Sequence, residues 1–156
     1  MERIASFTVN HDRFGKGMYI SRVDGDVVSY DVRMKKPNGG EYLPVAAAHT
    51  LEHLLATFMR NGEYADSVVY VGPMGCRTGF YILLRDKVAY ATAIEFVKAA
   101  LAFARDYEGE IPGNTRQECG NYLEHDLVGA KAIAADMCEV LKNWAAEMLN
   151  YEVHYE

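Results

Sequence analysis

Two imidazoles and a carboxylate are spaced within five residues of this chain, His49-Thr50-Leu51-Glu52-His53. In a helix, His49 and His53 lie one turn apart on the same side, so both ring nitrogens can reach one ion, and Glu52 borders that side. The arrangement H-x-x-E-H is a metalloenzyme signature. A solvated helix face with two chance histidines is the plainer alternative, but two of the chain's five histidines lie in this one turn of an otherwise apolar segment. We therefore predict a metal site here.

A catalytic zinc-type site has three protein ligands and one open position, so the histidine pair needs a third ligand. Cys119 is a candidate, because it is a soft ligand in a glycine-containing bend, and a His/His/Cys set suits Zn²⁺, Fe²⁺ or Co²⁺. Spacing alone does not favour Cys119 over three potential ligands that follow it closely, which are Glu124, His125 and Asp126.

A second group with chemical potential is the turn Gly72-Pro73-Met74-Gly75-Cys76-Arg77-Thr78-Gly79. Its glycines and proline predict a shaped turn with Cys76 at the tip or edge. The commonest fate of a free cysteine is to be a small buried hydrophobe. Here, however, the adjacent Arg77 favours a thiolate, and the glycines allow a ligand to come close. We therefore predict a functional Cys76.

The elements that position these groups follow from the apolar periodicity. A central helix is predicted from about Pro44 to Asn61-Gly62. Strands at 17–23 and 27–34 flank Asp24-Gly25 and predict a hairpin, with Arg33 on its polar face and open to a site or to solvent. The remaining predicted elements are a strand at 3–10, strands at 67–71 and 80–84, helices at 92–105 and 114–119, and a long helix from 126 to about 148.

Some positions near the C-terminus are expected to carry no chemistry. Cys138 lies inside the long predicted helix and is expected only to pack. The tail from Tyr151 onward has no informative pattern, and its His154 is expected to be solvated.

Composition excludes several classes of protein. The 156 residues, half of them hydrophobic, fit one globular domain spanning 1–156. A formal charge of −6 and no basic run longer than Lys35-Lys36 argue against a nucleic-acid partner. The absence of a signal-peptide core and of any run near ~18 apolar residues predicts a cytoplasmic protein without a membrane partner. Three widely spaced cysteines form no disulfide framework, which leaves thiols for a metal or for catalysis.

The motifs together resemble those of the S-ribosylhomocysteine lyase (LuxS) family, which makes the precursor of the autoinducer-2 signal. H-x-x-E-H alone is shared with unrelated hydrolases, whereas the full set is highly specific and spans nearly the whole chain in the family's order. Besides the helix motif, the matching blocks are Ser6-Phe7 with His11, Tyr30-Asp31-Val32-Arg33, Pro37-Asn38, Pro73-Met74-Gly75-Cys76-Arg77-Thr78-Gly79-Phe80-Tyr81, Cys119-Gly120-Asn121-Tyr122, and His125-Asp126-Leu127 with Gly129-Ala130-Lys131.

The resemblance implies an α+β fold, with an antiparallel β-sheet packed with about four α-helices, assembled as a homodimer with active sites at the interface. It also implies one divalent metal per chain, Fe²⁺ in the first place, with Zn²⁺ or Co²⁺ also suitable. The metal ligands it implies are His49, His53 and Cys119. The acid/base pair it implies is Glu52 with Cys76.

The implied substrate is S-ribosylhomocysteine, whose ribose and amino-acid end would be held by Ser6, His11 and Arg33. In the implied reaction, the carbonyl of the opened ribose shifts twice along its chain. Homocysteine then leaves by β-elimination, and the other product is 4,5-dihydroxy-2,3-pentanedione, the autoinducer-2 precursor. The metal would stabilise enediolate charge as a Lewis acid, and no redox cofactor is needed.

One departure from the family pattern precedes the cysteine turn. The family usually has Asp-Ile-Ser where this chain has Tyr70, Val71 and Gly72. An acidic residue near the thiol is therefore missing, which bears on turnover and substrate range.

Two alternative functions follow from the same residues. One is a metallohydrolase in which Glu52 activates a metal-bound water and a carboxylate such as Glu124 is the third ligand. The other is a metal-loaded homodimer that has lost activity and binds a ligand or partner.

Overall fold

The sheet begins with the predicted hairpin, formed by β1 (Gly17–Asp24) and β2 (Val27–Arg33). Gly25 makes the turn with φ +59°, a left-handed conformation that glycine adopts without steric penalty. On its other side β2 pairs with β4, which in turn pairs with β3, so the four antiparallel strands lie in the order β1-β2-β4-β3. The bounds of the second pair are Val68–Pro73 for β3 and Gly79–Arg85 for β4.

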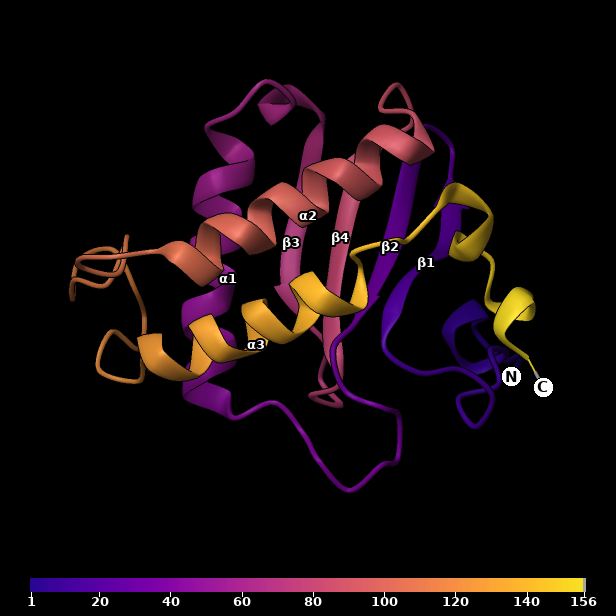
Figure 1. Cartoon of the computed structure of the whole chain (residues 1–156), viewed down its shortest axis with the longest axis horizontal. Helices are drawn as coiled ribbons and strands as arrows, with labels where there is room; N and C mark the ends of the chain where they lie inside the picture. Colours follow the sequence, from indigo (N-terminus) through magenta and orange to yellow (C-terminus); the bar gives the residue numbers. More distant parts are fainter. Residues whose placement is uncertain (156) are drawn as a thin grey trace.

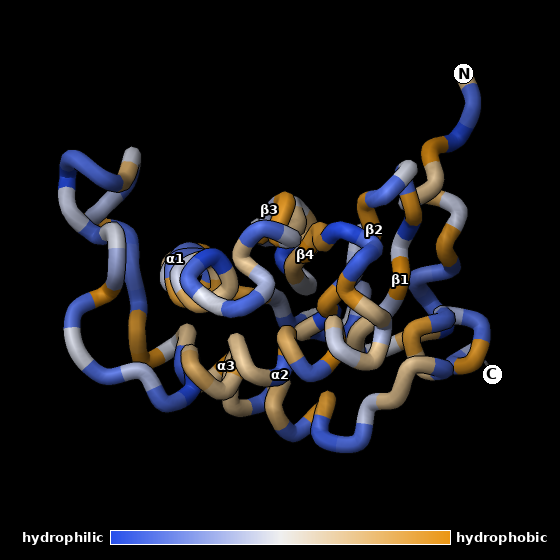
Figure 2. The backbone as a smooth tube through the Cα atoms, turned by 90° about the horizontal axis from the view of Figure 1, so that it is seen from above, coloured by the Kyte–Doolittle hydropathy of each residue, from blue (hydrophilic) through white to orange (hydrophobic). Residues whose placement is uncertain are grey.

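The structure, a computed structural model, describes residues 1–155. Within this range there are three α-helices where the sequence predicts about four, namely α1 (Val45–Arg60), α2 (Tyr90–Asp106) and α3 (Leu127–Val140). α2 and α3 cross one side of the sheet, and α1 lies beside β3 (Figures 1 and 2). No described helix has both the length and the apolar character needed to cross a membrane.

A single large core joins the helices to the inner face of the sheet. On β2 the side chains of Val28, Tyr30 and Val32 point into this core, as the alternation of the strand predicts. The apolar stripe of α1, including Leu51 and Leu55, packs against the same cluster. Cys138 is half-buried against it, which confirms the prediction that it packs.

Three predicted elements are wrong in type or length. The predicted strand at 3–10 pairs with no other strand, and its backbone hydrogen bonds stay local in a 3₁₀ turn, Ala5–Phe7. The predicted helix at 114–119 is a single turn closed on Thr115. The long helix predicted to reach 148 ends at Val140, because the chain then folds back and the Trp144 indole N–H donates to the Met18 carbonyl at 2.8 Å.

The outer face of β2 is also buried, so Arg33 is not open to solvent, although its guanidinium reaches Thr78 in the cysteine turn. Asp31 is 0% exposed and Arg33 3% exposed. The C-terminal tail and the segment before β1 meet beside this face, where the Asn10 N–H donates to the Tyr155 hydroxyl at 3.4 Å. The C-terminal tail, expected to be uninformative, places Tyr151 in a small cluster with Phe14 and Tyr19. Tyr151, which donates to Asp31, and Phe14, whose ring lies under the Arg33 guanidinium, therefore help to close this face.

His154 is another correction in the same region. It is half-buried rather than solvated, and its ring stacks on Trp144 with centroids 5.1 Å apart. Its Nε2 lies 2.8 Å from the carbonyl of Met148. The tail is thus fixed by specific contacts.

Gly79 provides a test of the β2–β4 packing. A Cβ at this position would lie 2.3 Å from the Val32 carbonyl oxygen, which is backbone and cannot move aside cheaply. Gly79→Ala should therefore destabilise the fold by about 1–3 kcal/mol and lower the thermal midpoint by about 3–10 °C. Gly15→Ala is the matched control, since a Cβ there meets nothing within 4 Å. Equal midpoints for Gly79→Ala and the parent protein would contradict this packing.

Candidate functional site

The two histidines of α1 are held by backbone carbonyls from the segment that joins α2 to α3. His49 Nδ1 lies 2.8 Å from the Glu124 carbonyl oxygen, and His53 Nδ1 lies 2.8 Å from that of Pro112. A carbonyl can only accept, so each Nδ1 carries the proton and donates it. In the neutral ring, each Nε2 then carries no proton and has a free lone pair, which is the form of histidine that binds a metal.

A third imidazole, that of His125, stacks on His49 with ring centroids 4.0 Å apart. Its Nδ1 lies 2.9 Å from the Thr50 hydroxyl oxygen. This hydroxyl donates to the Ala46 carbonyl and accepts the Asp126 N–H, so the remaining contact is filled by donation from His125 Nδ1. The Nε2 atom is left as an acceptor, buried and without a partner among residues 1–155.

The donor atoms of His49, His53, Cys119 and His125 all lie within 4.8 Å of one another, and Cys119 Sγ is 3.4 Å from His49 Nε2. A tetrahedron with metal–ligand bonds of about 2.0–2.3 Å has edges of about 3.3–3.8 Å, so the cluster is close to a binding geometry. Burial, and then the neighbouring His49 and His53, lower the pKa of His125, which favours the neutral ring. The unpartnered Nε2 and the nitrogen and sulfur donors therefore fit a divalent metal of the Zn²⁺, Fe²⁺ or Co²⁺ kind.

The other two potential ligands near Cys119 have different tasks. The Glu124 carboxylate accepts from the Asn121 side chain at 3.3 Å. The Asp126 carboxylate accepts the Gly129 N–H at 2.9 Å and caps the start of α3. The cluster found among the described residues thus contains no carboxylate, contrary to what the metallohydrolase alternative requires.

Glu52 is half-buried on α1, next in sequence to His53. Among residues 1–155 its carboxylate enters no hydrogen bond or ion pair, whereas each of the nearby histidines has its Nδ1 engaged. The Glu52 carboxylate thus lies at the border of the candidate metal-binding residues and is available to move a proton.

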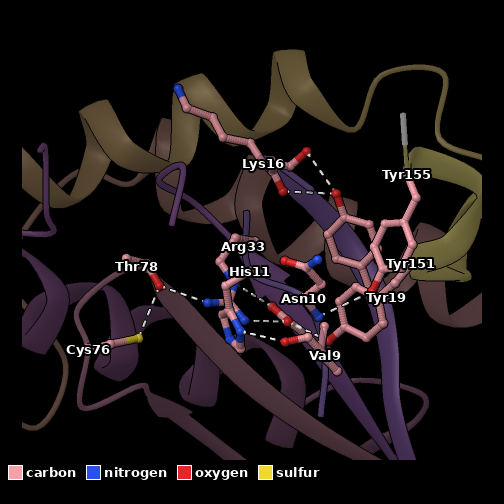
Figure 3. Close-up of polar contacts among 12 residues, drawn as sticks. Val9, Asn10, His11, Lys16, Tyr19, Arg33, Cys76, Thr78, Tyr151 and Tyr155 are labelled. Carbon is pink, nitrogen blue, oxygen red and sulfur yellow. Dashed lines mark hydrogen bonds and ion pairs between the residues drawn. The ribbon is translucent and has the colours of Figure 1, made fainter. Parts of the chain in front are cut away.

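Cys76 lies exposed in the turn between β3 and β4, as predicted. Its Sγ is 3.1 Å from the Thr78 hydroxyl, which accepts from Arg33 Nη1 at 2.9 Å (Figure 3). Arg77, which the sequence suggested as the activating cation, adopts φ +60° and places its guanidinium 5.7 Å from the Tyr42 ring centre. The cation connected to the thiol by hydrogen bonds is therefore Arg33.

Of the other predicted site residues, Ser6 lies in the 3₁₀ turn Ala5–Phe7 and lines a cavity of about 270 Å³ with Tyr70 and Tyr81. His11 is half-buried, with Nδ1 2.9 Å from the Val9 carbonyl and its ring 5.5 Å from that of Phe14. Both come from the N-terminal segment.

The departures at Tyr70 and Gly72 form one structural change. The Tyr70 phenol folds over Gly72, where a Cβ would lie 2.1 Å from the phenol oxygen. A serine at 72 would occupy the same space, so the loss of that side chain makes room for the ring. Tyr70 is half exposed, at 50%, and contributes to the cavity near Ser6.

The metal centre can be tested through its thiolate ligand. We expect the cobalt form of Cys119→Ala to lose the thiolate-to-cobalt absorption band. After dialysis the parent protein should hold about one metal ion per chain and the variant much less, because an incomplete ligand shell binds metal weakly. Cys138→Ala is the matched control, as Cys138 only packs against the core. Full occupancy with an unchanged band in Cys119→Ala would remove Cys119 from the metal centre.

Comparison with known proteins gives a consistent result. The family model described as S-Ribosylhomocysteinase (LuxS) matches residues 4–148. An S-ribosylhomocysteine lyase of Clostridium acetobutylicum is 44% identical over 97% of this chain and 99% of its own length. The corresponding lyases of Phocaeicola vulgatus and Borreliella afzelii are 43% and 38% identical, each over 97% of this chain and over 98% and 99% of their own lengths. With the family model covering most of the sequence, the chain belongs to the S-ribosylhomocysteinase (LuxS) family.

Proposed function

We propose that this chain is a metal-dependent carbon–sulfur lyase that converts S-ribosylhomocysteine into homocysteine and 4,5-dihydroxy-2,3-pentanedione, the autoinducer-2 precursor. The observation that carries the proposal is the combination of two groups in one chain of this family. One is the His/His/Cys/His cluster with Glu52 beside it. The other is the Cys76 thiol, bonded to Thr78.

In this proposal the metal ligands are His49, His53 and Cys119, with His125 Nε2 facing the same centre. The bound ion, Fe²⁺ in preference to Zn²⁺ or Co²⁺, would act as a Lewis acid that stabilises negative charge on a sugar oxygen next to the reacting carbon. The Nδ1–H bonds to Glu124 and Pro112 hold His49 and His53 in the tautomer and orientation this task needs.

The acid/base work falls to Glu52 and Cys76. Each carbonyl shift removes a proton from one carbon and returns it to the neighbouring carbon, so one group must act first as base and then as acid. In the elimination, a proton leaves the carbon next to the carbonyl, and the C–S electron pair departs with homocysteine. The two products together contain all atoms of the substrate, so no oxidant, reductant or water is consumed.

Ser6, His11 and Arg33 are the proposed contacts to the substrate's ribose and amino-acid end. Ser6 supplies a hydroxyl at the cavity that Tyr70 also lines. Three of the five N–H groups of Arg33 are engaged by Asp31 and Thr78, which leaves the others for a carboxylate or hydroxyl of the substrate. Tyr70 lines the cavity next to Ser6, so in this proposal its side chain affects which substrates fit.

A homodimer with shared sites is supported by the positions of these segments. The N-terminal segment, which carries Ser6 and His11, lies at one end of the molecule, and the segment joining α2 to α3, which carries Cys119, lies at the opposite end in both views (Figures 1 and 2). Ser6 and His11 of one chain are therefore separated from the metal-binding cluster of the same chain. In a homodimer, Cys76, Ser6 and His11 of one chain would lie next to the metal centre and Glu52 of the other chain.

The remaining expectations are part of the same proposal. The single core that joins all three helices to the sheet supports residues 1–156 acting as one domain. The expected location is the cytoplasm, and the expected partners are the small-molecule substrate and the second copy of the chain.

The lyase reaction can be measured as free thiol released from S-ribosylhomocysteine under anaerobic, metal-replete conditions, with Cys76→Ala as the blank. Glu52→Gln should keep the metal and the fold but lose about 10²-fold or more of the activity, because an amide occupies similar space and cannot shuttle a proton. Glu63→Gln, at an exposed position after α1, is the matched control and should retain the activity. Parent protein that releases no more thiol than the blank would refute the lyase assignment.

The shared site can be tested by complementation. When Cys76→Ala and Glu52→Gln chains are coexpressed, a site built from two chains should regain about a quarter of the parent activity, since about half of the dimers are mixed and each mixed dimer has one intact site of two. Sites contained within one chain predict no recovery. A mixture as inactive as either variant alone, with mixed dimers verified by two affinity tags, would contradict the shared site.

A further inference from the structure

A continuous set of polar contacts runs from the C-terminal tail to the cysteine turn. The Tyr151 phenol donates to Asp31 Oδ2 at 2.6 Å. Arg33 donates to both oxygens of Asp31, from Nε at 3.0 Å and from Nη2 at 2.5 Å. Its Nη1 donates to the Thr78 hydroxyl at 2.9 Å, and that hydroxyl lies 3.1 Å from Cys76 Sγ (Figure 3). Tyr151 is thus connected to Cys76 through Asp31, Arg33 and Thr78.

The middle of this set is withdrawn from water. Asp31 is 0% exposed, Arg33 and Thr78 are each 3% exposed, and Tyr151 is 9% exposed. A buried ion pair is tolerated only when its remaining lone pairs and protons are satisfied, and hydrogen bonds are stronger in such surroundings. Tyr151 satisfies Asp31 on one side of the pair, and Thr78 satisfies Arg33 on the other.

The hydrogen bonds around Thr78 allow its hydroxyl to donate to the Cys76 sulfur. Because Arg33 donates to the Thr78 oxygen, the Thr78 proton is free to be donated to sulfur. Burial, and then the charge of Asp31, raise the pKa of Tyr151, so its phenol stays protonated and donates to the carboxylate. Without this donor, Asp31 would hold Arg33 more tightly and weaken the polarisation of Thr78.

We propose that Tyr151 is a positioning residue which, through Asp31, Arg33 and Thr78, keeps Cys76 as a thiolate. The proposal deepens the lyase assignment and rests on it for the role of Cys76 as a base. It gives the C-terminal tail a part in catalysis without contact to the substrate.

Other charged or titratable groups also lie near the thiol. They are Arg77, in the same turn, and Tyr81 on β4, whose pKa is raised mainly by burial and to a smaller extent by the charges of Asp31 and Cys76. Neither is changed by a substitution at Tyr151, so the effect of the tail can be measured against a constant background.

The test is the pH dependence of Cys76 alkylation by iodoacetamide in the metal-loaded protein without substrate, read on the Cys76 peptide by mass spectrometry. Tyr151→Phe keeps the ring, which stacks on Tyr19 at 4.7 Å, and removes the hydroxyl that donates to Asp31. We expect the alkylation midpoint to rise by about 0.5–1 pH unit, with a rate about three- to tenfold lower below the midpoint.

Tyr19→Phe is the matched control. Tyr19 is a buried phenol in the same aromatic cluster, but its hydroxyl donates to the Gly15 carbonyl at 2.8 Å rather than to Asp31. Its alkylation midpoint should equal that of the parent protein. An equal rise in both variants would mean that loosening of the cluster, not the bond to Asp31, moves the thiol, and would overturn the proposal.

Variants of Thr78 decide whether the effect passes through its hydroxyl. Thr78→Ser keeps the hydroxyl and should keep the midpoint, whereas Thr78→Val should raise it. Adding Tyr151→Phe to Thr78→Val should produce no further rise, because the two changes interrupt one connection. Additive shifts, or a Tyr151→Phe midpoint equal to the parent's, would overturn the proposal.

These measurements need no turnover. The protein could release no homocysteine while substitutions at Tyr151 and Thr78 still raise the alkylation midpoint of Cys76. In that case the connection between tail and thiol stands and the lyase assignment fails. If homocysteine is released and the midpoint ignores Tyr151, the lyase assignment stands and this inference fails.

Discussion

Three hydrogen bonds from imidazole Nδ1 atoms hold the candidate metal centre together. Each joins groups far apart in sequence, His49 to Glu124, His53 to Pro112 and His125 to Thr50. These bonds fix the tautomer and the orientation of each ring, and they also hold the segment between α2 and α3 against α1. Because that segment carries Cys119, the same bonds bring the thiol within 3.4 Å of His49 Nε2. Helical spacing brings the candidate metal ligands His49 and His53 together, and long-range hydrogen bonds bring Cys119 and His125 to them.

The thiol of the cysteine turn depends on a different interaction, the buried pair of Asp31 and Arg33. A buried pair contributes little to stability by itself, since the desolvation of both charges opposes their attraction. The pair instead fixes the orientation of the Arg33 guanidinium. Two of its nitrogens donate to the Asp31 carboxylate, and the third donates to the Thr78 hydroxyl, which contacts Cys76. The candidate metal ligands and the cysteine turn are thus held by separate networks, which is compatible with the proposal that they meet across two chains.

The sequence predicted those features that depend on local patterns. The hairpin at Gly25, the bounds of α1 and the position of Cys76 in a turn follow from turn residues, apolar spacing and glycine content. Spacing could not choose among the potential ligands after Cys119, because the choice depends on where their side chains bond across the fold. The roles of Thr78 and Tyr151 were missed for the same reason: a tyrosine 120 residues from its carboxylate partner leaves no local signal. Residues 3–10 are β-prone, but they pair with no strand, and their backbone hydrogen bonds stay within a 3₁₀ turn.

The most direct test of the metal centre is X-ray absorption at the metal edge of the loaded protein. The arrangement described here predicts one sulfur scatterer at about 2.3 Å together with imidazole nitrogens at about 2.0–2.1 Å, with the sulfur lost in Cys119→Ala. A first shell of only nitrogen and oxygen in the parent protein would contradict the assignment of Cys119 and, with it, the account of how this site is built.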